Sequence, residues 1–147
     1  MILTKAKLSK NLIIDYISAA YMVFFGYTAF NKLLNLSSFQ NNIFKTGLFP
    51  EFLVKPLSIT VILAEIFVIV ILIFNKMIGL LLLTIMMLSF TVYISFLNSR
   101  GQYELCGCGG VLNGLPYNYH LLINLVILTS SFFCYITLNQ NHELQKK

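Results

Sequence analysis

Residues 57–97 decide the fold of this chain, and they read LSITVILAEIFVIVILIFNKMIGLLLLTIMMLSFTVYISFL. The stretch contains two apolar runs, 57–74 and 77–97, separated only by Asn75 and Lys76. About 20 apolar residues cross a bilayer as a helix. Because backbone N–H and C=O groups must be paired within such a segment, β-branched residues do not argue for strands here. We therefore predict two transmembrane helices that form a tight antiparallel hairpin.

Two further apolar runs flank the hairpin, at about 12–34 and 121–138. Hydrophobic residues make up 58% of the 147 residues and charged residues only 10%, whereas a soluble domain carries about 25% charged residues. This composition excludes a water-soluble globule, and four spans leave no room for a separate soluble domain. The prediction is an all-α integral membrane protein, a single domain over residues 1–147 built as a four-helix transmembrane bundle.

The N-terminus starts with basic residues that are typical of a secretory signal, but Asp15 interrupts the apolar run that such a signal needs. We interpret residues 12–34 as a retained helix, and a cleaved signal is the alternative. Four spans place the connections 35–56 and 98–120 on one side of the membrane, where functional side chains are expected.

The charge of +5 comes from ten basic residues against five acidic ones. These bases lie at the ends of apolar runs, which indicates anchoring at an anionic membrane surface and no binding of nucleic acid. They divide six to four between the two sides: Lys5, Lys7, Lys10, Lys76, Lys146 and Lys147 against Lys32, Lys45, Lys55 and Arg100. The positive-inside rule then predicts a multi-pass protein of a bacterial inner membrane with both termini in the cytoplasm.

The first outer connection contains the pattern of a short amphipathic helix. Phe39, Ile43 and Phe44 are predicted on one helical face, with polar residues around them. Such a helix would lie at the membrane interface and would end at Gly47 and Pro50.

Cys106 and Cys108, in the second outer connection, are separated only by Gly107 and are followed by Gly109-Gly110. A bridge between them closes a very small ring, which makes it more oxidising and easier to exchange than a structural disulfide. The glycines are expected to leave the sulfurs uncovered for an incoming thiolate. The alternative interpretation is a tight turn with two incidental thiols.

The remaining cysteine, Cys134, lies fourteen residues past His120, or about 21 Å deeper at 1.5 Å per residue. It cannot reach the cysteine pair and is predicted to be a packing residue. A copper(I) site is an alternative, because copper(I) prefers sulfur ligands and the chain contains Met77, Met86 and Met87 besides the cysteines. The ligand spacing for zinc is missing, so no metal site is predicted.

His120 opens the fourth span and shares a helical face with Asn124. A histidine at this position can accept a proton from a thiol, stabilise a thiolate, or donate a hydrogen bond to a quinone carbonyl. The helix N-terminus also favours a nearby thiolate. The alternative is an interfacial histidine that caps the helix start beside Pro116.

Glu65 lies inside the second span, where a carboxylate is costly unless it is protonated or paired. Lys32, near the outer end of the first span, is the nearest partner in depth. A Glu65–Lys32 pair could tune a site or could simply fix the packing of two helices.

Seven segments form a recognisable set: Ala29-Phe30-Asn31-Lys32-Leu33-Leu34, Phe39, Glu65, Arg100-Gly101, Cys106-Gly107-Cys108-Gly109-Gly110, Leu115-Pro116-Tyr117-Asn118-Tyr119-His120 and Asn124. Together they resemble the MauE branch of the DoxX-like four-helix membrane proteins. The resemblance spans nearly the whole chain, and the Cys-Gly-Cys-Gly segment after the third span is its specific part.

The resemblance implies an inner-membrane protein associated with redox maturation of exported proteins. The family is named for a methylamine-utilisation member thought to assist the disulfide-rich small subunit of methylamine dehydrogenase. This chain has Gly109-Gly110 where many relatives read Cys-Gly-Cys-Phe-Gly, so the aromatic ring beside the cysteines is missing. The client protein is therefore left open, and methylamine metabolism is not inferred.

The leading hypothesis is a redox-active component of a thiol/disulfide exchange pathway that works with a periplasmic thioredoxin-like or multi-cysteine exported protein. Cys106 and Cys108 would exchange the disulfide, and His120 would accept a proton. The residues expected to support them are Glu65, Lys32, Asn124 and Arg100. No cofactor is evident, and a quinone is the candidate electron acceptor, for which the sequence defines no site. The alternatives are a non-enzymatic scaffold subunit of a membrane complex and, third, a copper-handling protein.

Overall fold

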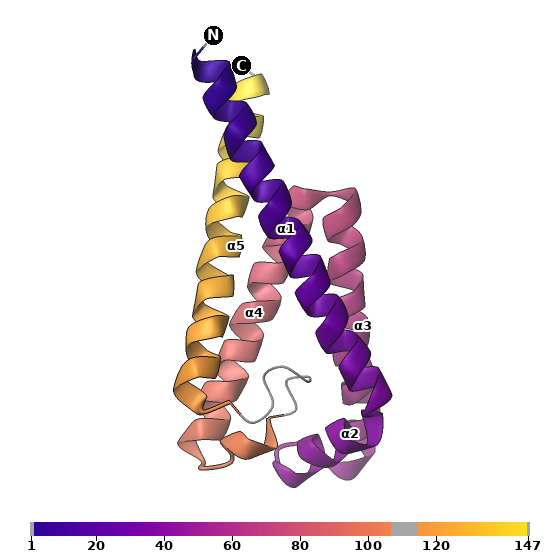
Figure 1. Cartoon of the computed structure of the whole chain (residues 1–147). Coiled ribbons are helices and arrows are strands. Elements are labelled where there is room, and N and C mark those ends of the chain that lie inside the picture. Colours follow the sequence, from indigo (N-terminus) through magenta and orange to yellow (C-terminus); the bar gives the residue numbers. More distant parts are fainter. Residues whose placement is uncertain (1, 107–114, 147) are drawn as a thin grey trace.

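A computed structural model of the chain describes residues 2–106 and 115–146. Within these residues the elements are α1 (Ile2–Leu34), α2 (Leu36–Lys45), α3 (Glu51–Phe74), α4 (Lys76–Ser99), the 3-10 turn η1 (Tyr103–Leu105) and α5 (Tyr117–Lys146) (Figure 1). Four of the helices, α1, α3, α4 and α5, are long and apolar enough to cross a membrane. The predicted all-α membrane bundle is confirmed.

The spanning helices are longer than the apolar runs predicted, and the outer connections are correspondingly shorter. Helix α3 begins at Glu51 and contains Pro56, which the sequence reading had placed before the helix. Pro56 is the sixth residue of α3, so it has no N–H to donate to the carbonyl of Phe52, and membrane-spanning helices tolerate such a proline. Pro50, with φ −63° and ψ 149°, is the extended residue that precedes the helix. Helix α5 likewise begins at Tyr117 and not at 121.

The predicted hairpin of α3 and α4 is confirmed, and a single non-helical residue, Asn75, joins the two helices. The Asn75 side chain accepts a hydrogen bond from the N–H of Ile78 at 3.2 Å and so caps α4. A Cβ added at Gly79 would lie 2.4 Å from the Cα of Leu72. The helices can approach this closely only because Gly79 has no side chain.

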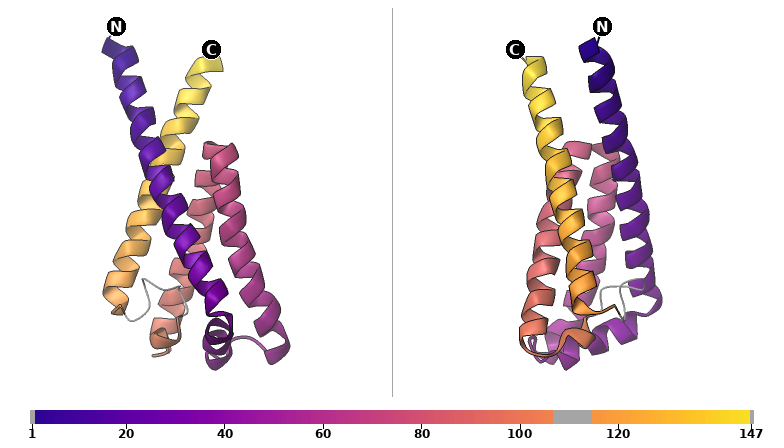
Figure 2. Two further views of the ribbon diagram at one scale, coloured as in Figure 1. Left: turned by 45° about the vertical axis from the view of Figure 1, so that its right-hand side comes forward. Right: turned by 60° about the vertical axis from the view of Figure 1, so that its left-hand side comes forward.

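The bundle is arranged around the hairpin, with α1 packed on α3 and α5 packed on α4. Helix α1 runs obliquely past α5 (Figure 2), and a 2.6 Å hydrogen bond between the hydroxyls of Tyr21 and Ser130 joins the two. Both termini point toward the end where the hairpin turns, while α2 and η1 lie at the opposite end (Figure 1). This arrangement agrees with an even number of spans.

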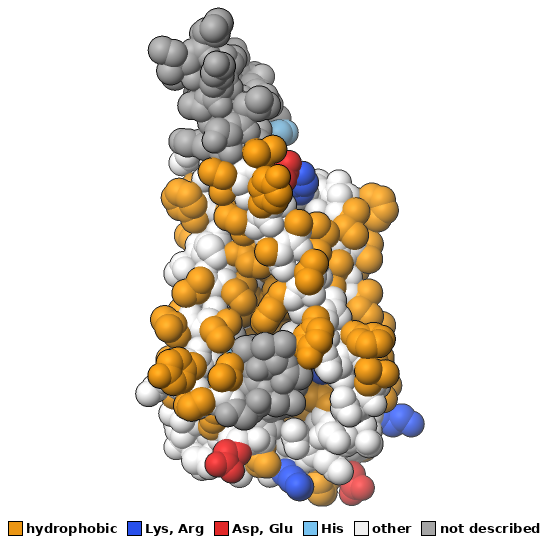
Figure 3. Space-filling view, viewed as in Figure 1, with side chains coloured by type: hydrophobic (Ala, Val, Ile, Leu, Met, Phe, Trp, Pro, Cys, Tyr) orange, Lys and Arg blue, Asp and Glu red, His pale blue; other side chains and the backbone are white. Residues whose placement is uncertain are grey.

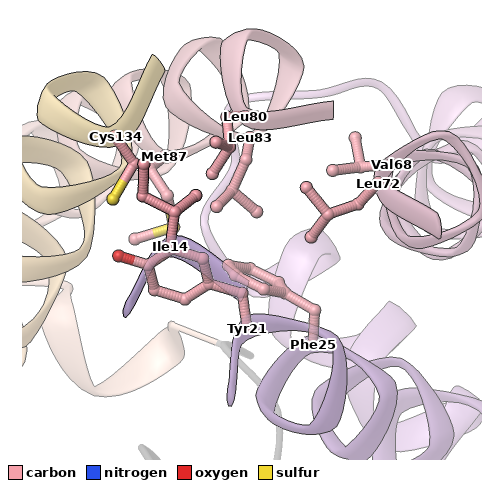
Figure 4. Packing of buried hydrophobic residues seen from close by; sticks show 9 residues of the cluster. All are labelled: Ile14, Tyr21, Phe25, Val68, Leu72, Leu80, Leu83, Met87 and Cys134. Carbon is pink, nitrogen blue, oxygen red and sulfur yellow. The ribbon is translucent and has the colours of Figure 1, made fainter. Parts of the chain in front are cut away.

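The core of the bundle lies where α1, α3, α4 and α5 meet (Figure 4). Its buried residues are Ile14, Tyr21, Phe25, Val68, Leu72, Leu80, Leu83, Met87 and Cys134. Cys134 is 3% exposed, so its predicted role as a packing residue is confirmed. Met87 also packs in this cluster, as methionines in helical cores commonly do.

Apolar side chains also cover the outer surface of the spans (Figure 3). Each spanning helix contributes large exposed examples, such as Val23, Phe67, Val92 and Phe133. Soluble monomers rarely expose apolar area of this extent, and a lipid bilayer provides the environment that such a surface requires. The chain is a multi-pass membrane protein.

Helix α2 closes one end of the bundle, and it confirms the predicted short helix in the first connection. Gly47, with φ +63°, lies in the left-handed region just after the helix, as the sequence indicated. The predicted face is wrong in one residue: Ile43 is 5% exposed, but Phe44 is 50% exposed. At about 100° per residue, Phe44 is turned roughly 140° from Phe39 and so leaves the face that Phe39 and Ile43 share.

Candidate functional site

All five helices contribute to a cavity of about 220 Å³ at the end of the bundle that α2 closes. Most of its wall is aromatic or aliphatic, including Phe24, Phe25, Phe39, Phe49, Leu57, Val61, Phe90 and Tyr93. Its polar lining comprises Thr28 and Ser89 together with four residues predicted from sequence: Lys32 from α1, Glu65 from α3, and His120 and Asn124 from α5. The structure therefore brings together four of the seven site residues predicted from sequence.

Lys32 and Glu65 form an ion pair across the α1–α3 contact, with side chains 5% and 1% exposed. The Lys32 ammonium also lies 5.9 Å from the ring centroid of Phe39 and 5.7 Å from that of Phe90, distances at which an aromatic face stabilises a cation. Only one carboxylate oxygen of Glu65 is used. The other, Oε2, is buried and has no hydrogen-bond partner among the residues the structure describes.

His120 is 2% exposed and lies beside Tyr103 of η1. The Tyr103 hydroxyl donates to the carbonyl oxygen of Leu115 at 2.8 Å and lies 2.9 Å from His120 Nδ1. A phenol has one proton, so a hydroxyl that donates to a carbonyl must accept from the imidazole. The proton of His120 is therefore on Nδ1, and Nε2 of the neutral ring is an acceptor.

Tyr103 also connects this histidine to the cysteine segment. Its carbonyl oxygen accepts the N–H of Cys106 at 2.9 Å, and its ring packs against the cluster formed by Ile94, Leu97 and Cys106. Partial burial raises the pKa of the Tyr103 phenol, which keeps it protonated at physiological pH. The sequence reading missed Tyr103, because nothing in its spacing from His120 indicates a contact across seventeen residues.

Cys106 is 8% exposed, so the expectation that the glycines leave both sulfurs uncovered is wrong for this residue. The reason is that η1 turns the chain back over α4, where Cys106 packs against Ile94 and Leu97. Cys106 is disulfide-bonded, whereas Cys134 is a free thiol. Cys108 lies outside the described residues, as do Gly109 and Gly110, so the Cys106–Cys108 bridge stays a prediction.

Arg100 lies apart from the cavity. It follows α4 and is exposed, and its guanidinium carbon lies 4.9 Å from the ring centroid of Phe96. This position does not support the predicted role of Arg100 beside the other site residues. Within the described part of the chain, no group of three His, Cys, Asp or Glu side chains is placed to hold a metal ion.

Residues 10–137 match the sequence model of a family described as methylamine utilisation protein MauE. The match covers most of the chain, including the helices that form the cavity and the cysteine segment. No curated protein and no solved structure matches the chain.

Proposed function

The chain belongs to the MauE family of membrane proteins, and from that premise we propose that it is the membrane component of a thiol/disulfide exchange pathway for exported proteins. The observation that carries this proposal is the position of Cys106. This disulfide-bonded residue packs against Tyr103, and the Tyr103 hydroxyl holds His120 at the cavity. The side chain of Tyr103 thus connects the disulfide-bonded Cys106 to His120, a group that can take up a proton.

The proposed reaction is an exchange between a Cys106–Cys108 disulfide and a dithiol of the partner. A partner thiolate attacks one sulfur, so that a mixed disulfide forms and the other sulfur leaves as a thiolate. The second partner thiol then attacks the partner sulfur of the mixed disulfide, so that the partner disulfide forms and the second cysteine of this chain leaves as a thiolate. Two electrons and two protons pass from the partner dithiol to the two cysteines, and the reverse sequence of steps returns them.

The burial of Cys106 assigns different roles to the two sulfurs. Because Cys106 is 8% exposed, we expect the partner to attack Cys108 and the thiolate to be released on Cys106. The N-terminal end of α5, where His120 lies, stabilises a nearby anion. Tyr103, which packs against Cys106, and His120, which lies at hydrogen-bond distance from Tyr103, are then the groups to which we assign the proton that this thiolate exchanges.

Three further residues support the arrangement. The Lys32–Glu65 pair fixes α1 against α3 and so holds one wall of the cavity. Asn124, 3% exposed, lies one turn after His120 and lines the same cavity.

The proposed location is a bacterial inner membrane, with both termini in the cytoplasm and the cysteine segment on the periplasmic side. The six-to-four division of basic residues supports this orientation, and both termini and the α3–α4 turn lie toward the same end of the bundle. A disulfide persists on the oxidising side of that membrane and is reduced on the other.

Trapping of the partner tests the proposal. In Cys106→Ser, the remaining Cys108 can attack the partner but cannot resolve the product, so a mixed disulfide should accumulate. The Cys108→Ser variant should trap less, because the remaining sulfur is the buried one. Cys134→Ser is the matched control and should behave as wild type. Absence of a trapped partner in both loop variants would contradict exchange.

One observation favours the second candidate, a non-enzymatic scaffold subunit. A sulfur that is packed against Ile94 and Leu97 resembles a structural staple more than an exposed reactive group. The scaffold interpretation predicts that both loop variants, Cys106→Ser and Cys108→Ser, lose stability or assembly without trapping any protein.

A further inference from the structure

We propose that the cavity lined by Lys32, Glu65, His120 and Asn124 binds the ring of a membrane quinone, which accepts the electrons of the exchange reaction. The proposal rests on the proposed function, because it assigns the acceptor and its site to that pathway. It starts from the cavity and from a polar atom inside it that the described residues leave without a partner.

The dimensions and walls of the cavity suit one substituted ring. Its volume is about 220 Å³, and a cavity of about 150 Å³ in a protein core accommodates benzene. The walls contain several aromatic rings, with Phe24, Phe39 and Phe90 among them. A flat ring stacks favourably on such walls.

The cavity also reaches the lateral surface of the spans. Of the residues that line it, Ser89 is exposed, and Leu57 and Val61 are partly exposed. All three belong to helices long enough to cross a membrane. A molecule with a ring and a long apolar tail could therefore place the ring in the cavity and leave the tail among the lipids. A water-soluble substrate does not require a site that opens between membrane-spanning helices.

The polar atoms match the two states of a quinone. Glu65 Oε2 is buried and has no hydrogen-bond partner in the described part of the chain, and His120 Nε2 is an acceptor in the neutral ring. Both can accept the hydroxyl hydrogen of a quinol. The amide of Asn124 can donate to a quinone carbonyl, and Lys32 stays paired with Glu65 Oε1. An empty apolar cavity would not need a buried, unpaired carboxylate oxygen in its wall.

The electron balance closes with no further reactant. Two cysteine thiols lose two electrons and two protons to become the disulfide, and a quinone gains both to become the quinol. The residues of this chain hold and move the protons: His120 at Nε2 and Glu65 at Oε2. Tyr93 both lines the cavity and packs against the cluster that contains Cys106, so the two sites share a wall.

The test measures binding of decylubiquinone and menadione to the purified full-length protein in quinone-free nanodiscs. An azido-quinone should label peptides of the cavity wall, and decylubiquinone should raise the melting temperature and compete with the label. Val61→Phe, which fills the cavity from α3, should weaken binding at least tenfold. Leu63→Phe is the matched control on the same helix, with a side chain 59% exposed, and should bind as wild type.

A second variant keeps the proposal falsifiable if Val61→Phe fails to fold. Asn124→Leu conserves the volume but removes the amide, and it should weaken binding while the protein stays folded. Wild-type protein without saturable labelling, or full binding by whichever of these two variants folds, would overturn the proposal. A trapped partner without quinone binding would contradict only this inference, whereas quinone binding without a trapped partner would contradict the exchange function and leave the ring site in place.

Discussion

Two lysine–carboxylate pairs join helices at opposite ends of this bundle, and their environments differ sharply. Lys32 and Glu65 link α1 to α3 beside the cavity, with side chains 5% and 1% exposed. Lys76 and Asp15 link α4 to α1 near the hairpin turn, where the nitrogen–oxygen distance is 2.6 Å and the side chains are 46% and 51% exposed. The same chemistry is thus used once inside the protein and once at its surface.

The difference in burial between the two ion pairs indicates which end of the molecule contains the functional site. An exposed pair contributes about 0–1 kcal/mol to stability. A buried pair must first repay the loss of hydration of both charges, and apolar residues of similar size are often as stabilising. Packing alone therefore does not account for the Lys32–Glu65 pair. Glu65 Oε2 has no hydrogen-bond partner among residues 2–106 and 115–146, which indicates that this end is arranged for a ligand or a proton.

Reversal of the buried charge should have the largest effect. Glu65→Lys places two ammonium groups at one buried contact, and breaking a buried pair costs about 3–5 kcal/mol, so we expect little folded protein. Glu65→Gln should be tolerated better, because it adds no charge. Yield after size-exclusion chromatography and melting temperature measure both variants. If the two are indistinguishable from wild type, the residue has no role in the bundle.

Removal of both charges of the buried pair should affect stability less than Glu65→Lys does. It separates the role of the pair in packing from its role in the site. Lys32→Leu/Glu65→Leu should change the free energy of unfolding by no more than about 2 kcal/mol in either direction, since apolar replacements of buried pairs are often neutral. Quinone binding and exchange should nevertheless fall. The melting temperature and the labelling assay measure the two effects. A double variant that binds quinone as wild type would show that the pair only holds the helices.

Loss of the Tyr103 hydroxyl should cost about 1 kcal/mol, the usual net value of one hydrogen bond. Tyr103→Phe leaves His120 Nδ1 without its acceptor, so the ring is no longer held in one tautomer. We expect slower exchange of the mixed disulfide at an almost unchanged melting temperature. Tyr119→Phe is the control, because that side chain is 62% exposed and adjacent to His120 in sequence. Equal rates for both variants would contradict the role of Tyr103.

The smallest effect is expected at the exposed pair. Asp15→Asn should lower stability by about 0.5 kcal/mol or less at low salt, and the difference should vanish at high salt because exposed charges are screened. Thermal unfolding at two salt concentrations measures this. A loss as large as that of Glu65→Lys would show that the two ends of the bundle do not differ as described.

Much of the fold follows from the sequence because the bilayer imposes strong constraints. The length of the apolar runs predicts the four spans, and the two-residue interruption at Asn75-Lys76 predicts the hairpin. The Lys32–Glu65 pair follows from the depth of two charges in neighbouring spans, since neither is stable alone in lipid. These inferences use only local composition and distance along a helix axis.

The errors and omissions arise where tertiary packing decides. The start of α3 at Glu51 was missed because Pro56 looked like a helix boundary. The burial of Cys106 depends on η1 folding back over α4, and the contact of Tyr103 with His120 depends on the same turn. The cavity itself requires α2 to close the end of the bundle, and no periodicity in the sequence shows an enclosed space.

The central claim is that Cys106 and Cys108 form a reversible disulfide on the outer face of the membrane, and thiol labelling in intact cells tests it most directly. A membrane-impermeant maleimide should label the protein only after reduction, and the label should fall mainly on Cys108, because Cys106 is 8% exposed and Cys134 is 3% exposed in the bundle core. Labelling of either loop cysteine without reductant, or no labelling after reduction, would contradict the account.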